Sequence, residues 1–144
     1  MSDANYELGS PDWLAMLRGI FEQTVAAGGD SDDVEFSMCE VYTNVPARIS
    51  AEPQVAWHLR VKAGEMMFLT EEVDDVDIKI VGEWALLSKL SGLEYGDAGP
   101  PSDAAAEVAK ATDEGRFHFT ASPTMQSPPP GFAAVHNQVA RRTL

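Results

Sequence analysis

The stretch VAWHLRVKAGEMMFLTEE, from Val55 to Glu72, decides the fold of this 144-residue chain. Over Val55–Lys62 every second residue is a large apolar one, and the residues between them are mostly polar. This alternation is typical of a β-strand with one buried and one exposed face. Ala63-Gly64 suits a tight turn, and Glu65–Glu72 is expected to return as the antiparallel partner strand. The sequence therefore predicts a β-hairpin near its centre.

Helices and further strands are predicted on both sides of this hairpin. Ser10-Pro11-Asp12 is typical of a helix start, and apolar residues then recur every three or four positions as far as Val25. The other predicted elements are a strand over Val34–Val45, a strand around Val76–Ile80, a helix from Glu83, a helix over Asp103–Thr112, a strand over Arg116–Ala121 and a helix over Gly131–Arg142. This order, α-ββββ-αα-β-α, predicts an α/β protein of the α+β type. Helices on one face of a mostly antiparallel sheet would bury its apolar residues.

The length of the chain predicts a single domain over residues 1–144. Residues 1–9 are polar, and we expect them to be flexible. Residues 122–130 hold four prolines, and we expect an extended segment there because proline fixes φ and disfavours helix before it.

The net charge of −13 limits the classes of partner. Such a field repels nucleic acid and anionic membrane surfaces, so neither is an expected partner. No apolar run approaches the roughly 20 residues that cross a bilayer, and stable membrane insertion is not expected. Cys39 is the single cysteine, which excludes an intrachain disulfide. Together with the lack of a signal-peptide pattern, this predicts a cytoplasmic protein.

Motifs for metals and cofactors are missing from the sequence. The loop Asp30-Ser31-Asp32-Asp33 fails as a calcium-binding EF-hand because Val34 and Glu35 stand where an oxygen ligand and a glycine are needed. The three histidines lack zinc-helix spacing, and His58 and His118 are expected to face solvent from their strands. No glycine-rich phosphate loop and no serine-nucleophile motif occurs. We therefore predict neither a metal nor a cofactor.

An acidic run from Glu71 to Asp77 is the best place to look for acid–base chemistry. A surface turn that discourages edge-to-edge pairing explains most of these carboxylates. Asp77 is the strongest catalytic candidate because Val76 and Ile78 place it inside a strand, and His58 and Glu65 are the others. Their substrate would be apolar, as in a small isomerase, cyclase or dehydratase that needs no cofactor.

The run Met66–Leu69 is apolar on both faces of its strand. Such a strand is either covered on both sides or lines a cavity. Methionine adapts to irregular cores and to irregular ligands alike, so the two interpretations stay open at this point.

In the order of its elements the chain resembles the sterol carrier protein 2 (SCP2) family of lipid-binding domains. The likeness rests on the opening helix with the strands from Val34 to Glu72, on VDDVDIKIVGEW at residues 73–84, and on EGRFHF at residues 114–119. It spans most of residues 12–142. The chain departs from the family at Ala121-Ser122-Pro123, where a glycine-aspartate is common, and in its proline-rich segment.

The resemblance implies a five-stranded sheet covered by helices, with a hydrophobic tunnel for a sterol, a fatty acid or an acyl-CoA ester. It carries over no catalytic residue. From their apolar positions we expect the lining to include Phe21, Met38, Met66, Phe68, Trp84, Leu87 and Phe132.

Three functions therefore stay open: lipid binding or transfer, which we favour, the small enzyme described above, and a subunit whose apolar groove accepts a protein partner. A homodimer is compatible with each. The first two differ in whether an ionisable group points into the cavity.

Overall fold

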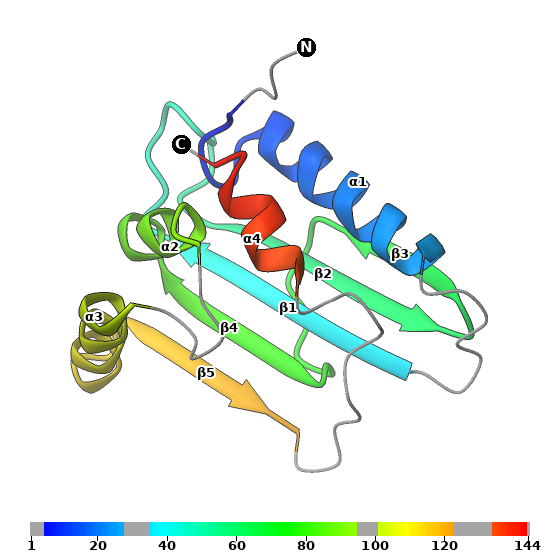
Figure 1. The fold of residues 1–144 in the computed structure, drawn as a ribbon. Coiled ribbons are helices and arrows are strands. Elements are labelled where there is room, and N and C mark those ends of the chain that lie inside the picture. Colours follow the sequence, from blue (N-terminus) through cyan, green and yellow to red (C-terminus); the bar gives the residue numbers. More distant parts are fainter. Residues whose placement is uncertain (1–4, 28–34, 95–100, 123–133, 144) are drawn as a thin grey trace.

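The computed structural model describes residues 5–27, 35–94, 101–122 and 134–143 (Figure 1). In chain order its elements are α1 (Pro11–Ala27), β1 (Glu35–Thr43), β2 (Val55–Lys62), β3 (Glu65–Leu69), β4 (Ile78–Glu83), α2 (Trp84–Ser91), α3 (Ser102–Asp113), β5 (Phe117–Ala121) and α4 (Val135–Ala140). The predicted order of helices and strands is confirmed.

The five strands form one sheet in the order β3-β2-β1-β4-β5. Three neighbouring pairs are antiparallel, whereas β1 and β4 run parallel, with Met38 opposite Ile78. The prediction of a mostly antiparallel sheet is therefore confirmed. The parallel pair makes β1 the central strand, with a neighbour on each side along its length.

The β2–β3 hairpin turns where the sequence predicted it. Ala63 and Gly64 both have positive φ, at 52° and 77°, which is the conformation of a two-residue type I′ turn. The returning strand is shorter than expected and ends at Leu69. Strand β4 likewise begins only at Ile78, because residues 70–77 leave the plane of the sheet.

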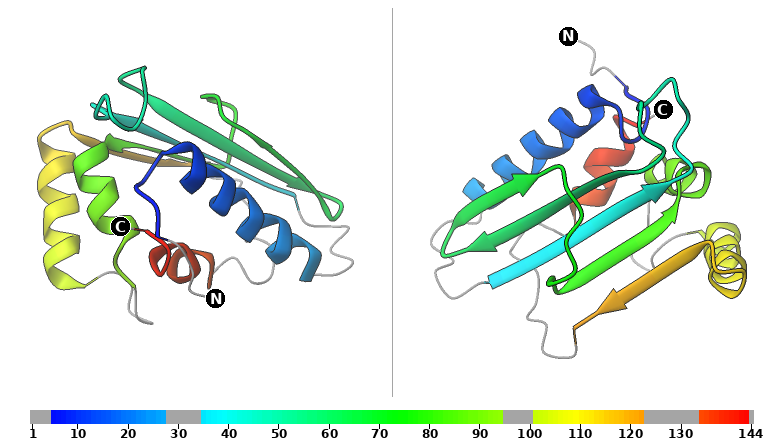
Figure 2. Two further views of the ribbon diagram at one scale, coloured as in Figure 1. Left: turned by 90° about the horizontal axis from the view of Figure 1, so that it is seen from above. Right: turned by 180° about the vertical axis from the view of Figure 1, so that it is seen from behind.

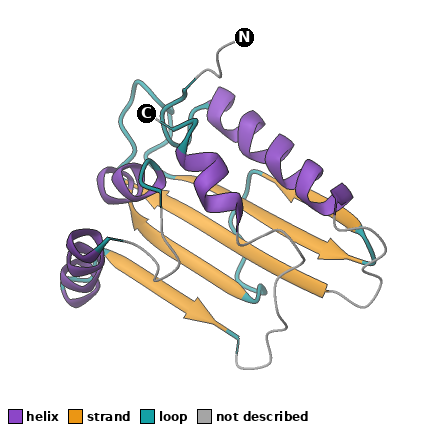
Figure 3. Cartoon of the chain, viewed as in Figure 1, coloured by secondary structure: helices purple, strands orange, loops and turns teal. Residues whose placement is uncertain are grey.

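The helices cover one face of the sheet, as expected (Figures 2 and 3). Ser10 caps α1 as predicted, with the Trp13 backbone amide donating to Ser10 Oγ at 3.2 Å. α1 buries one apolar stripe against the sheet, and α4 packs beside it. The rings of Phe21 and Trp57 lie 5.5 Å apart, and Trp57 stacks on Phe68 at 5.6 Å.

The opposite face of the sheet is crossed by residues 70–77, which link β3 to β4 (Figure 2, right). This crossing corrects one expectation: His58 is not exposed but only 2% accessible, because its ring lies beneath the linking segment and contacts it. Cys39 on the same face is fully buried, as expected for a small apolar side chain. His118 on β5 is exposed, as predicted.

Part of the N-terminal segment that we expected to be flexible packs against the fold. Leu8 is fully buried, and the Tyr6 amide donates to the Arg142 carbonyl at 2.9 Å. Tyr6 and Thr143 form a parallel β-bridge. The indole Nε1–H of Trp13 donates to Thr143 Oγ1 at 3.0 Å, so the two ends of the described chain are held together.

Several predictions lie outside the described residues. They concern the aspartate loop at residues 30–33, Phe132 and nearly all of the proline-rich segment. In the part of the chain that the structure describes, no helix has the length and apolarity to cross a membrane.

Candidate functional site

A carboxylate lies in the middle of the helix-covered face of the sheet. In β1 the residues Phe36, Met38, Glu40 and Tyr42 share this face, because side chains two positions apart point the same way. Glu40 is opposite Trp57 on β2 and opposite Ile80 on β4. The central strand therefore brings an ionisable group into a layer of aromatic and aliphatic side chains.

Two hydrogen bonds in series hold this carboxylate. Tyr42 Oη donates to Glu40 Oε1 at 2.8 Å, and the Trp57 indole Nε1–H donates to Tyr42 Oη at 2.8 Å. Because an indole only donates, the phenol proton is left to point at Glu40. The chain Trp57–Tyr42–Glu40 therefore fixes the position of one carboxylate oxygen.

Burial also changes the proton affinity of this carboxyl group. Desolvation raises the pKa of Glu40 to about 6, against the opposing effect of the hydrogen bond from Tyr42. Burial, followed by the nearby charge of Glu40, raises the pKa of Tyr42 well above 10. Tyr42 is therefore a neutral donor at neutral pH, while Glu40 titrates close to that range.

Glu40 lines a cavity of about 240 Å³ between the sheet and the helices. Its apolar walls come from α1, β1, β2 and α4. They are Trp13, Leu17 and Phe21 on α1, Met38 on β1, Trp57 on β2, and Val135 and Val139 on α4. Glu40, Ser91 and His136 supply the polar part of the lining. A mostly apolar hollow with a few placed polar groups is the usual form of a small-molecule site.

His136 approaches this cavity from α4. Its Nε2 lies 2.7 Å from the Leu93 carbonyl oxygen, which requires Nε2 to carry a proton that it donates. Burial lowers the pKa of His136, which favours the neutral imidazole. At neutral pH the cavity therefore contains a carboxylate and no cationic histidine.

Only some of the side chains expected to bind a ligand lie at this cavity. Phe21 and Met38 line it. Phe68 and Leu87 are buried elsewhere in the core, and Met66 packs at its edge. Trp84, at the start of α2, does not line the cavity, and its indole Nε1–H donates to the Leu8 carbonyl at 2.8 Å.

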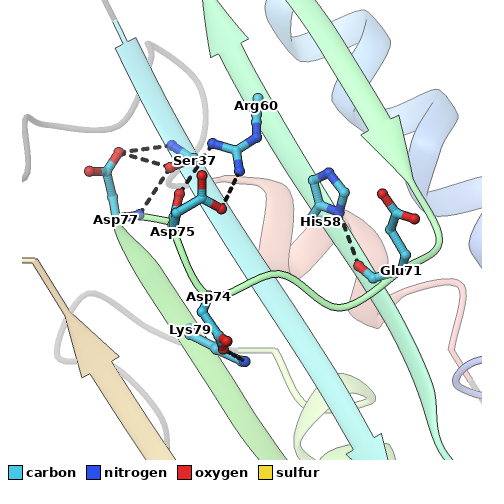
Figure 4. Close-up of polar contacts among 8 residues, drawn as sticks. All are labelled: Ser37, His58, Arg60, Glu71, Asp74, Asp75, Asp77 and Lys79. Carbon is cyan, nitrogen blue, oxygen red and sulfur yellow. Dashed lines mark hydrogen bonds and ion pairs between the residues drawn. The ribbon is translucent and has the colours of Figure 1, made fainter.

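The three side chains considered for acid–base catalysis do not line the apolar cavity. Figure 4 shows two of them beside the segment that crosses the other face of the sheet. His58 Nδ1 lies 3.0 Å from the Glu71 carbonyl oxygen. Asp77 Oδ2 accepts from the Ser37 backbone amide at 2.9 Å. Glu65 is exposed at the start of β3.

A second hollow, of about 510 Å³, lies near the start of β1 and includes Asp77. Its lining is mainly charged or polar, and Arg60 there pairs with Asp75 at 2.8 Å. Within the described residues no three histidine, cysteine or acidic side chains group closely enough to hold a metal ion. This larger hollow therefore lacks the mostly apolar walls of the smaller one.

Glu40 is the site residue that the sequence analysis missed. The signal was present, because Glu40 continues the alternation of Phe36 and Met38 and so falls on the face expected to be buried. A carboxylate at an apolar position of a central strand is rarely buried without a specific partner.

Several solved structures are similar to this chain, and sterol carrier protein 2 is among them. The conserved hypothetical protein TT1886 from Thermus thermophilus, described as possibly a sterol carrier protein, is 14% identical with a TM-score of 0.49, and the match covers 97% of this chain and 94% of that one. The chain resembles SCP2 proteins in fold.

Two further structures show the same likeness. Sterol carrier protein 2 is 15% identical with a TM-score of 0.44, over 94% of this chain and 92% of that one. An SCP2 protein of ubiquinone synthesis, UbiJ, is 12% identical with a TM-score of 0.40, over 92% and 94%. No family model and no curated protein matches the sequence. At these identities the likeness concerns the fold alone, so function is argued below from the site.

Proposed function

We propose that this protein binds an apolar ligand in the cavity between α1, α4 and the sheet. The observation that carries the proposal is the 240 Å³ hollow whose walls are the side chains of Trp13, Leu17, Phe21 and Trp57. Burying a ligand against such walls is favourable in proportion to the apolar area removed from water. Lipid binding or transfer follows as the function.

The volume limits how much of a ligand enters. At roughly 30 Å³ for each water-sized group, a cavity of about 240 Å³ holds on the order of eight such groups. That is a medium-length alkyl chain or one end of a sterol. A long fatty acid or an acyl-CoA ester would keep the rest of its length outside this hollow.

The alternatives have less support from the structure. Asp77, His58 and Glu65 do not line the apolar cavity, so the enzyme that we considered could not use them as its base there. Glu40 is the carboxylate that does line it, and its Oε1 already accepts a hydrogen bond from Tyr42. The protein-interaction alternative would need an open apolar groove, whereas the side chains of Trp13, Leu17 and Trp57 are at most 3% accessible. Binding of a small apolar ligand in the cavity requires no such open groove.

The proposal is tested with a substitution that enlarges a side chain in the cavity wall and so reduces the space for a ligand. Met38→Trp places a larger side chain where Met38 lines the hollow, and Met67→Trp makes the same change at an exposed position of β3. Octanol binding is measured by calorimetry for both variants and the wild type, and native mass spectrometry of the purified protein looks for lipid already bound.

We expect saturable octanol binding to the wild type and to Met67→Trp, and binding at least about tenfold weaker to Met38→Trp, equivalent to ~1.4 kcal/mol. Absence of saturable binding to the wild type, or equal weakening in both variants, would contradict the proposal. Circular dichroism in the aromatic region verifies that each variant keeps its packed core.

A further inference from the structure

Glu40 has one hydrogen-bonding oxygen left over. Among the described residues, its Oε1 accepts from Tyr42, and no hydrogen bond or ion pair is made by Oε2. Glu40 lines the apolar cavity and is half-buried, and its Oε2 is not among the fully enclosed side-chain atoms that lack a partner, so this oxygen is accessible from the cavity. A ligand that enters the cavity and displaces solvent from Oε2 would have to supply a donor in its place, because an acceptor left without one in an apolar site is costly.

The neighbouring donors are already engaged. The Trp57 Nε1–H goes to Tyr42 Oη, and His136 Nε2 goes to the Leu93 carbonyl. None of the ion pairs formed by the described residues includes Glu40, although ten lysines and arginines occur in the chain. Among the described residues, Glu40 is therefore a negative centre of the cavity without an ion-pair partner.

We propose that Glu40 selects ligands whose apolar body ends in a hydrogen-bond donor, a hydroxyl or a protonated amine, against those that end in a carboxylate. This inference rests on the proposed function and names the end group of its ligand. A hydroxyl or an ammonium would donate to Oε2 and satisfy it. A fatty-acid carboxylate would place two like charges together in an apolar site, which disfavours binding.

The experiment compares three probes of one chain length: octanol, octylammonium and octanoate. Their affinities for the wild type are measured by calorimetry at about pH 7.5, where a side chain with a pKa of about 6 is ionised. We expect octanol and octylammonium to bind roughly tenfold to a hundredfold more tightly than octanoate, the range for a hydrogen bond to a charged group. Octanol and octylammonium together distinguish a neutral donor from a charged one.

Glu40→Gln removes the charge and keeps the shape. In this variant we expect octylammonium to lose about tenfold in affinity and octanoate to gain, so that the preference largely disappears. Glu35→Gln is the matched control, because it makes the same change on the same strand at an exposed position outside the apolar cavity. It should keep the wild-type preference.

A second measurement needs only the wild type. At about pH 5.5 Glu40 is largely protonated, whereas octanoate, with a pKa near that of an ordinary carboxyl group, is still mostly ionised. The ratio of octylammonium to octanoate affinity should therefore fall at least about fourfold from its value at about pH 7.5, because the ionised fraction of Glu40 falls about fourfold and octanoate gains at the same time. Among the described lining residues, His136 on α4 is the other titratable group, and burial lowers its pKa. The lining residues from α1, α2 and β2 carry no titratable side chain.

The outcomes separate the two proposals. If none of the probes binds the wild type, the proposed function and this inference both fail. Probes that bind the wild type with equal affinity, or that keep the same ratio in Glu40→Gln or at both pH values, overturn the inference and leave ligand binding intact. Loss of the preference in Glu40→Gln but not in Glu35→Gln supports it.

Discussion

Replacing Glu40 by glutamine should stabilise the protein at neutral pH and have little effect in acid. Burial raises the pKa of Glu40 from 4.5 to about 6, so the folded protein holds this proton more tightly than the unfolded chain does. The resulting stability is fully present below pH 4.5 and is lost as the pH rises through about 6. Glutamine resembles the protonated side chain at every pH and avoids this loss.

The magnitude follows from the two pKa values. Each pKa unit corresponds to ~1.4 kcal/mol, so a rise from 4.5 to about 6 corresponds to roughly 2 kcal/mol of unfolding free energy. The Tyr42 hydroxyl can still donate to the amide oxygen of the variant, which keeps the hydrogen bond at Oε1. The difference between Glu40→Gln and the wild type should therefore grow by ~2 kcal/mol from acid to neutral pH.

Urea unfolding followed by tryptophan fluorescence measures this difference at a series of pH values. Glu35→Gln is again the control, since an exposed carboxylate should give differences within about 0.5 kcal/mol at every pH. A difference for Glu40→Gln that stays flat between about pH 4.5 and pH 7 would refute the reasoning. It would mean that water reaches this carboxylate as freely in the folded protein as in the unfolded chain.

Two further predictions test how the two faces of the sheet are covered. Trp13→Ala should lower the unfolding free energy by ~3–5 kcal/mol, because this side chain is 2% accessible and bonds to Thr143; a loss below ~1 kcal/mol in urea unfolding would show that α1 is peripheral. His58→Leu should cost about 1 kcal/mol by removing the bond to the Glu71 carbonyl. It should also speed amide hydrogen exchange in residues 70–77 but not in β1, and unchanged exchange there would contradict the packing described.

The elements of the fold could be predicted because each has a local signal. Ser10-Pro11 starts α1, Ala63-Gly64 turns the hairpin, and alternation marks the strands. The parallel pairing of β1 with β4 has no such signal, because it joins residues about 40 positions apart. The burial of His58 was missed for a related reason: alternation assigns a residue to a face but does not say what covers that face.

The site could be predicted only in part. Phe21 and Met38 were selected as apolar side chains on the inner faces of their elements, and both line the cavity. The same criterion selected Phe68 and Leu87, which fill the core instead. Whether an inward-facing apolar side chain lines a cavity or fills the core depends on how closely the helices pack against the sheet. The periodicity of the sequence does not indicate how close that packing is. Glu40 broke an otherwise apolar pattern, which is the kind of local inconsistency expected at functional sites.

The position of α4 in the chain has a consequence for how the protein is made. Val135 and Val139 complete the cavity wall, yet they follow all five strands in the sequence. The last strand ends at Ala121, 14 to 18 positions before them, so synthesis at ~5–20 residues per second leaves roughly 1 to 4 seconds between the last strand and these side chains. During that interval the nascent sheet presents its apolar face and its carboxylate without the last wall. Under the proposed function, a ligand that meets the chain in this interval would be enclosed as α4 docks and would not have to pass through a finished opening.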